Sequence, residues 1–79
     1  MADTSQAAID LVEFIAKAIV EDSEAVRVTQ RDDSDTLELE TDVDDRGRVI
    51  GRQGRVAKAM RAVLAASPGC GNYRLEIVD

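Results

Sequence analysis

Hydrophobic and polar residues alternate with two different periods along the chain, and each period predicts a type of element. Between about Ser5 and Glu21, apolar residues recur at helical spacing with charged residues opposite, which predicts an amphipathic helix. Asp3 or Thr4 can cap its start by accepting hydrogen bonds from the first free amides. The inward face is formed by Ala8, Leu11, Val12, Ile15 and Ile19.

Three later segments alternate with period two and predict strands. Residues 25–31 and 36–41 flank the polar turn 32–35, so we expect a β-hairpin. A third strand is predicted for residues 73–78, after the loop that follows Pro68. The inward residues are Val26, Val28, Leu37, Leu39, Tyr73, Leu75 and Ile77.

Two helical segments lie between the hairpin and the last strand. The first is short: Asp42 can cap it, Asp44 and Asp45 favour the dipole of its first turn, and it stops at Gly51. Gly47 predicts a close contact between helices. The second covers residues 55–66, with Val56, Met60, Val63 and Leu64 inward and Arg55, Lys58 and Arg61 opposite.

The predicted order is therefore helix, strand, strand, short helix, helix, strand. No linker or repeat divides the 79 residues, so we expect one α+β domain over residues 1–79, with a flexible N-terminus at residues 1–4.

Composition excludes several classes of protein. Two aromatic residues are too few for the stacking surfaces of RRM or OB-fold domains. A single cysteine allows no internal disulfide, and the lack of histidine excludes the usual zinc sites, so a reducing cytoplasm fits. We find no export signal or membrane-spanning stretch, and we expect no cofactor.

The net charge of −6 opposes binding to nucleic acid, but its distribution does not. Residues 1–45 contain fourteen acidic and three basic residues, whereas residues 46–75 contain seven basic residues and no acidic one. The positive charge is thus concentrated in one part of the chain.

This basic part contains a Gly-x-x-Gly turn, Gly51-Arg52-Gln53-Gly54. Glycine tolerates close approaches that a Cβ forbids, so main-chain amides and the Arg52 guanidinium can reach the same phosphates. Such a turn clamps single-stranded RNA in KH domains. We expect the amides of residues 54–56 to bind phosphates at a helix start. Nearby Arg48, Arg55 and Lys58 are further candidate contacts.

The order of elements, with Val49-Ile50-Gly51-Arg52-Gln53-Gly54 followed by Arg55-Val56-Ala57-Lys58-Ala59, resembles a type II KH domain over nearly the whole chain. A free-standing domain of this length is similar to the small bacterial RNA-binding proteins of the KhpA (YlqC) type.

The resemblance implies a three-stranded mixed sheet with helices on one face and an RNA groove beside the turn. It places Ile50 and Val56 near the groove floor and makes residues 67–72 the variable loop. It further implies a homodimer, a heterodimer with a larger KhpB (Jag/EloR) type of KH protein, or both, acting as an RNA chaperone or post-transcriptional regulator that affects cell elongation. Arg46 departs from the apolar residue common in the family.

Three other readings were weighed. The sequence from Asp42 to Gly47 begins like a calcium loop, but Arg46 and Gln53 occupy ligand positions. An enzyme that binds nucleotides is disfavoured because the Walker and dinucleotide patterns are absent and no nucleophile has an activating histidine; Cys70 is read as an incidental thiol. The alternative that stays open is a protein-interaction subunit with a KH shape and little RNA affinity.

Overall fold

The computed structural model describes residues 4–32 and 34–78 and contains the elements in the predicted order. The three α-helices are α1 (Thr4–Ile19), α2 (Arg46–Ile50) and α3 (Arg55–Ala66), and the three strands are β1 (Arg27–Gln30), β2 (Thr36–Glu40) and β3 (Arg74–Ile77). Short 3₁₀ turns link them: η1 (Ser23–Ala25), η2 (Val43–Asp45) and η3 (Arg52–Gly54). This confirms the α+β arrangement.

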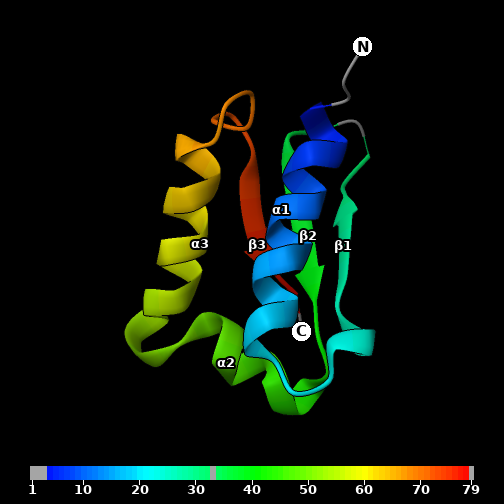
Figure 1. Cartoon of the computed structure of the whole chain (residues 1–79), viewed down its shortest axis with the longest axis vertical. Coiled ribbons are helices and arrows are strands. Elements are labelled where there is room, and N and C mark those ends of the chain that lie inside the picture. The colour runs from blue at the N-terminus through cyan, green and yellow to red at the C-terminus, as the bar shows by residue number, and fades with distance from the viewer. Residues whose placement is uncertain (1–3, 33, 79) are drawn as a thin grey trace.

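The strands form one mixed sheet in the order β1-β2-β3. The hairpin strands β1 and β2 are antiparallel, with Val28 opposite Leu39, whereas β2 and β3 are parallel, with Leu37 opposite Leu75. Parallel strands require a long crossover. Here the crossover contains η2, α2, η3 and α3, so the Gly-x-x-Gly turn lies at its midpoint, below α3 in Figure 1.

The core lies between the sheet and the helices, and α1 crosses in front of the sheet while α3 runs alongside β3 (Figure 1). Alanines at Ala8 and Ala16 are fully buried in α1 and bring this helix close to the strands. Burying aliphatic side chains here supplies most of the driving force for folding. The buried apolar residues are Ala8, Val12, Ala16, Val26, Val28, Leu37, Leu39, Val49, Ala57, Met60, Leu64, Cys70 and Leu75.

The structure corrects the predicted inward face of two helices. In α1 the buried line has a spacing of four residues and includes Ala16, whereas Ile19 is 38% exposed at the rim. In α3, Ala57 is buried and Val63 is 45% exposed. Helical spacing identified the approximate side of each helix, but small residues occupy the closest contacts because they allow the backbones to approach.

Element boundaries differ slightly from the predictions. Helix α1 ends at Ile19 and not at Glu21, while α3 has the predicted bounds. A flexible N-terminus was predicted for residues 1–4, but Thr4 is the first residue of α1. Residues 1–3, with the predicted cap at Asp3, lie outside the described residues, as does Asp33 of the hairpin turn.

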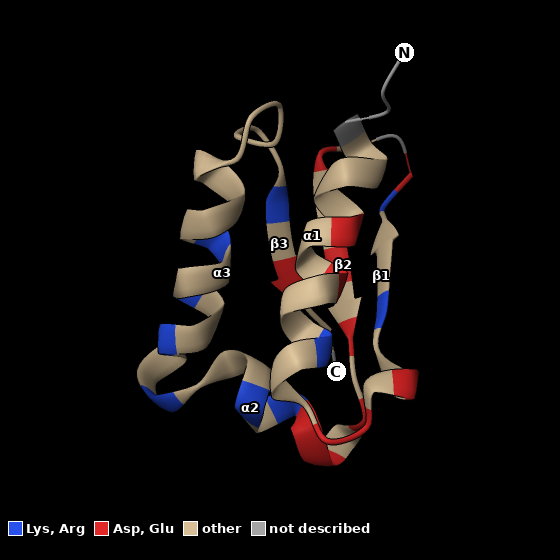
Figure 2. Ribbon diagram, in the orientation of Figure 1, with Lys and Arg blue, Asp and Glu red and all other residues tan. Residues whose placement is uncertain are grey.

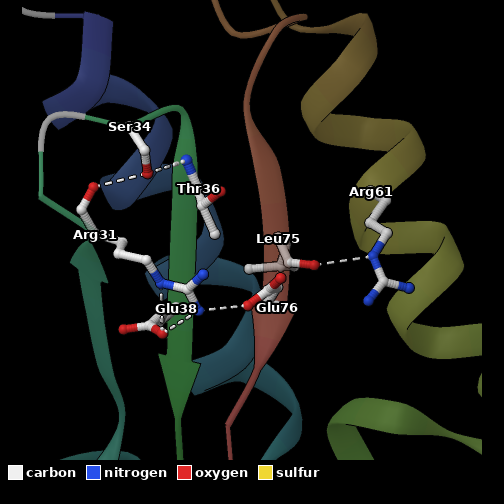
Figure 3. A network of polar contacts seen from close by, with 7 residues as sticks. All are labelled: Arg31, Ser34, Thr36, Glu38, Arg61, Leu75 and Glu76. Atoms are coloured by element: carbon white, nitrogen blue, oxygen red, sulfur yellow. Dashed lines mark hydrogen bonds and ion pairs between the residues drawn. The ribbon is translucent and has the colours of Figure 1, made fainter.

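The face of the sheet opposite α1 carries a network of charged side chains (Figure 3). Arg31 donates through Nη2 to Glu38 on β2 and to Glu76 on β3, each at 2.6 Å. Both carboxylates raise the pKa of Arg31, and Glu38 has the larger effect. Because these groups are largely exposed, the pairs add little to stability, but they link the hairpin to the last strand.

No helix within residues 4–32 and 34–78 is long and apolar enough to cross a membrane. The same ranges contain no group of three or more cysteine, aspartate or glutamate side chains arranged to hold a metal ion.

Candidate nucleic-acid interface

Helix α2 ends where Gly51 adopts a φ of 77° and a ψ of 169°. This conformation is essentially restricted to glycine. The Gly51 amide still donates to the Gly47 carbonyl at 2.8 Å, so the helix closes its last turn before the chain changes direction.

Gly51 is also needed because Val56 packs directly against it. A β-carbon at Gly51 would lie 2.5 Å from Cγ2 and 2.8 Å from the main-chain nitrogen of Val56. No rotation of the Val56 side chain removes the second clash, because it involves backbone. The end of α2 and the first turn of α3 are therefore held together by a contact that only glycine permits.

The rest of the turn is left-handed. Gln53 has a φ of 58° and Gly54 a φ of 74°. A β-carbon at Gly54 would meet nothing within 4 Å, so the dihedral angle and not space favours glycine there. Arg52 and Gln53 are both exposed, and the turn presents them to solvent together.

The turn uses some of its own amides. Gly54 donates to the Gly51 carbonyl at 3.1 Å, and Arg55 donates to the Arg52 carbonyl. Two of the three amides predicted to bind phosphates are thus engaged in this conformation. In the described part of the chain, the amides of Arg52 and Gln53 donate to no protein acceptor, so they are better placed to meet an anion.

The other predicted contacts lie on both sides of the turn. Ile50 is 37% exposed, while Val56 is half-buried and packs against the core. Arg55 and Lys58 are exposed on the first turn of α3. Figure 2 shows the basic residues of α2, the turn and α3 following one another along one end of the molecule. The structure therefore brings the predicted residues into one region.

Arg48 differs from the other basic residues because two carboxylates hold it. Its Nη1 lies 2.6 Å from Asp45 Oδ1 and its Nη2 lies 2.9 Å from Glu21 Oε1. These pairs direct the guanidinium toward the end of α1. A phosphate contact by Arg48 would have to compete with them.

Asp45 is buried, with 2% of its surface exposed, and sequence analysis missed this role. Its two carboxylate oxygens accept hydrogen bonds from the amides of Glu21 at 3.1 Å and Asp22 at 3.0 Å. Asp45 lies in the first turn of η2, as predicted, but its carboxylate also joins the chain after α1 to the start of α2. The i,i+3 spacing of Asp45 and Arg48 was the only local signal.

Asp42 behaves as predicted. Its side chain accepts a hydrogen bond from the Asp44 amide at 2.9 Å and caps η2, the turn that leads into α2.

Gly47 contradicts the prediction of a close helix contact. A β-carbon at this position would meet no heavy atom within 4 Å. The exposed face of α2 explains why the space is open.

The variable loop, residues 67–72, is closed by two successive turns. The Cys70 amide donates to the Ser67 carbonyl at 3.0 Å, and the Tyr73 amide donates to the Cys70 carbonyl at 3.2 Å. Cys70 is only 3% exposed, so its thiol packs in the core. The cysteine fixes the loop against the fold.

We expect Gly51→Ala to destabilise the fold by about 1–3 kcal/mol from its backbone conformation alone, with the clash against Val56 adding to this. Gly47→Ala is the matched control, because its site is helical and open; it should stabilise by about 0.4–1 kcal/mol. Urea unfolding of both variants measures the difference, and equal effects would contradict the proposed packing.

The Asp45→Asn variant tests whether the charge of the buried carboxylate stabilises the fold, because this contribution depends on pH. The amides of Asp22 and then Glu21, assisted by Arg48, hold the pKa of Asp45 below its usual value despite the opposing effect of burial. The carboxylate therefore stabilises the fold above its unfolded pKa of about 3.9 and loses this effect as the pH falls through the lower folded pKa.

The Asp45→Asn protein should accordingly be less stable than the natural chain at pH 7, and the gap should narrow below about pH 4. Free energies of unfolding in urea between pH 7 and pH 3 measure this, with exposed Asp44→Asn as the control. A gap independent of pH would show that charge is not the stabilising property.

Comparison with known proteins agrees with this fold and turn. Residues 9–77 match the KhpA/KhpB KH-domain family. The chain is 48% identical over 73 residues to the RNA-binding protein KhpA of Halalkalibacterium halodurans, which covers 87% of this chain and 96% of that protein. It is 43% identical to KhpA of Borreliella burgdorferi, covering 90% and 92% of the two chains.

A more distant relative has the same extent. KhpA of Streptomyces coelicolor is 39% identical over 72 residues, which covers 89% of this chain and 90% of that protein. No solved structure matches the chain significantly. With the α-β-β-α-α-β order and the Gly-x-x-Gly turn, these matches show that the chain belongs to the KhpA/KhpB family of KH domains.

Proposed function

We propose that this chain binds single-stranded RNA through the turn Gly51-Arg52-Gln53-Gly54. The observation that carries this proposal is an exposed left-handed turn with two unengaged amides beside the guanidinium of Arg52. The names of the relatives support the ligand, since each is an RNA-binding protein.

Phosphates are the groups that this turn holds best. The turn contains the amides of Arg52 and Gln53 and the exposed side chain of Arg52, while Arg55 and Lys58 extend the positive charge along α3. One such loop clamps roughly four nucleotides. Because neutralising about two to four phosphates of a single strand gives a salt slope of roughly −1.4 to −2.8, one domain should bind weakly and be sensitive to salt.

The apolar residues beside the turn receive the bases. Ile50 is partly exposed at the end of α2, and Val56 is half-buried at the start of α3. They flank the turn on the two helices. The phosphates are thereby placed outward, while the bases face aliphatic side chains. Arg48 supports α2 through Asp45 and contacts RNA less directly.

Weak binding by one domain favours an assembly with two. A homodimer, or a heterodimer with a larger KhpB (Jag/EloR) type of KH protein, would join two weak sites and raise the affinity through effective concentration. We propose that such a complex acts in the cytoplasm as an RNA chaperone or post-transcriptional regulator that affects cell elongation, without catalysis.

We expect the double variant Arg52→Asp plus Gln53→Asp to lose about tenfold or more of the affinity for a labelled eight-nucleotide RNA in fluorescence polarisation. Aspartate tolerates the left-handed conformation of Gln53, so the fold should persist by circular dichroism. The salt slope should become shallower.

The matched control is Arg27→Asp plus Thr29→Asp, which changes the net charge equally at two exposed positions of β1. This control should bind RNA with only a small loss. Equal losses in both proteins would mean that net charge, and not the turn, governs binding. Unchanged binding in the turn variant would favour the protein-interaction subunit, which the many acidic residues of the first half also fit.

A further inference from the structure

A hollow of about 490 Å³ lies along the seam between α3 and β3. This volume is within the range of sites for small ligands. It lies beside an edge strand, because within residues 4–32 and 34–78 β3 pairs with β2 alone. The lining residues are Arg61, Ala65, Tyr73, Arg74, Leu75 and Glu76.

The register of β3 points the main-chain N–H and C=O of one residue, Leu75, into this seam. The amides of Arg74 and Val78 donate to β2 and its flanking residue, at 2.7 Å to the Asp35 carbonyl and 3.0 Å to the Leu39 carbonyl. Residues alternate in the direction of their main-chain groups along a strand. The N–H and C=O of Leu75 therefore point away from the sheet, toward α3.

Arg61 crosses the seam to the Leu75 carbonyl. Its Nε donates to the Leu75 carbonyl at 3.0 Å, and Figure 3 shows the side chain extending from α3 toward β3. The sequence analysis placed Arg61 opposite the core with Arg55 and Lys58; Arg61 is indeed exposed, but its contact with β3 was not predicted. The hydrogen bond fixes the plane of the guanidinium at the edge of the hollow.

The two terminal amino groups of Arg61 are left to meet a ligand. Among the described residues they donate to no protein acceptor, whereas Glu76, the carboxylate that lines the same hollow, is paired with Arg31. The hydrogen bond from Nε thus orients the guanidinium, and the Nη1 and Nη2 groups remain available to a ligand in the seam.

A base with two adjacent acceptors matches this arrangement. Guanine offers O6 and N7 to an arginine fork, whereas adenine places an amino group at the position of O6. Ala65 and Tyr73 supply hydrocarbon for the face of a base, and the outward Leu75 amide adds a donor, although the Leu75 side chain itself is buried.

The seam is within reach of an RNA held at the turn. Arg61 lies six residues after Arg55, which corresponds to about 9 Å along α3. A clamp of roughly four nucleotides extends further than this. One strand can therefore contact the turn with its phosphates and the seam with a base.

We propose that Arg61 is a specificity-determining residue that selects guanine at one position of the bound RNA. This inference rests on the proposed function, since the turn must hold the strand while the seam reads the base. Arg61 is oriented by Leu75 and discriminates through its terminal amino groups.

The test uses heptanucleotides that are uridine throughout except for one central base: guanine, inosine, 7-deazaguanine or adenine. The natural chain should bind the guanine and inosine RNAs about 5- to 150-fold more tightly than the adenine RNA, because a bidentate pair discriminates by this factor. The 7-deazaguanine RNA, which lacks the N7 acceptor, should bind with an affinity between those of the guanine and adenine RNAs.

Arg61→Lys keeps the charge and removes the planar fork. It should bind the guanine and adenine RNAs within about twofold of each other while keeping the affinity for an all-uridine RNA. Lys58→Gln, on the same helix, is the control and should weaken all the RNAs alike. Thermal unfolding of Arg61→Lys checks that it is folded, because this variant also loses the hydrogen bond from Nε to the Leu75 carbonyl.

A separate measurement does not depend on folding of the variant. In the natural chain, the Nε–H resonance of Arg61 and the amide resonance of Leu75 should shift with the guanine RNA and not with the adenine RNA. Equal affinity for the two RNAs, or unmoved resonances, would overturn the base-reading role. A uniform loss in Arg61→Lys with a shallower salt slope would identify a phosphate contact and overturn it too.

The two proposals fail differently. If the Arg52→Asp plus Gln53→Asp variant binds all the RNAs as well as the natural chain, the clamp fails and this inference fails with it. If that variant loses binding but the natural chain does not prefer guanine, the clamp stands and only the role of Arg61 is lost.

Discussion

The contact between Gly51 and Val56 is the constraint on which the basic end of this molecule depends. It allows α2 to stop and α3 to start within four residues, because the missing Cβ leaves room for the Val56 backbone. The helices then lie on either side of a turn in which Arg52 and Gln53 are exposed. A longer connection between α2 and α3 would remove the need for this close contact. Its residues would, however, lose more conformational entropy when a ligand orders them. The tight packing instead fixes the turn before the ligand arrives.

Asp45 performs a related task in the interior. A buried carboxylate is costly unless hydrogen bonds compensate it, and here two main-chain amides and Arg48 do so. The result is a connection between the end of α1 and the start of α2, so that the turn is anchored to the rest of the fold through α2. Arg48 and Arg52, four residues apart in the sequence, thus have different roles: Arg48 is held by two carboxylates, whereas Arg52 lies in the turn.

Charge is distributed in a way that suits a weak and selective binder. The acidic first half of the chain repels polyanions, and the basic residues of the crossover offer the main route for RNA to approach (Figure 2). Long-range repulsion of this kind reduces nonspecific contacts. A small site of this type gains affinity only when a second site holds the same strand, which gives the proposed pairing of domains a physical reason.

The sequence by itself determined the order of the elements, the hairpin with Val28 and Leu37 inward, the bounds of α3, the cap at Asp42 and the position of the turn. These features follow from local rules of periodicity, capping and glycine conformation, which act over a few residues. The tertiary structure alone decided that Asp45 is buried, that Arg48 is held by carboxylates, that Cys70 packs in the core, and that Arg61 reaches Leu75. Each of these depends on residues distant in the chain, because a carboxylate becomes a structural acceptor only when the fold brings amides from another element within hydrogen-bonding distance.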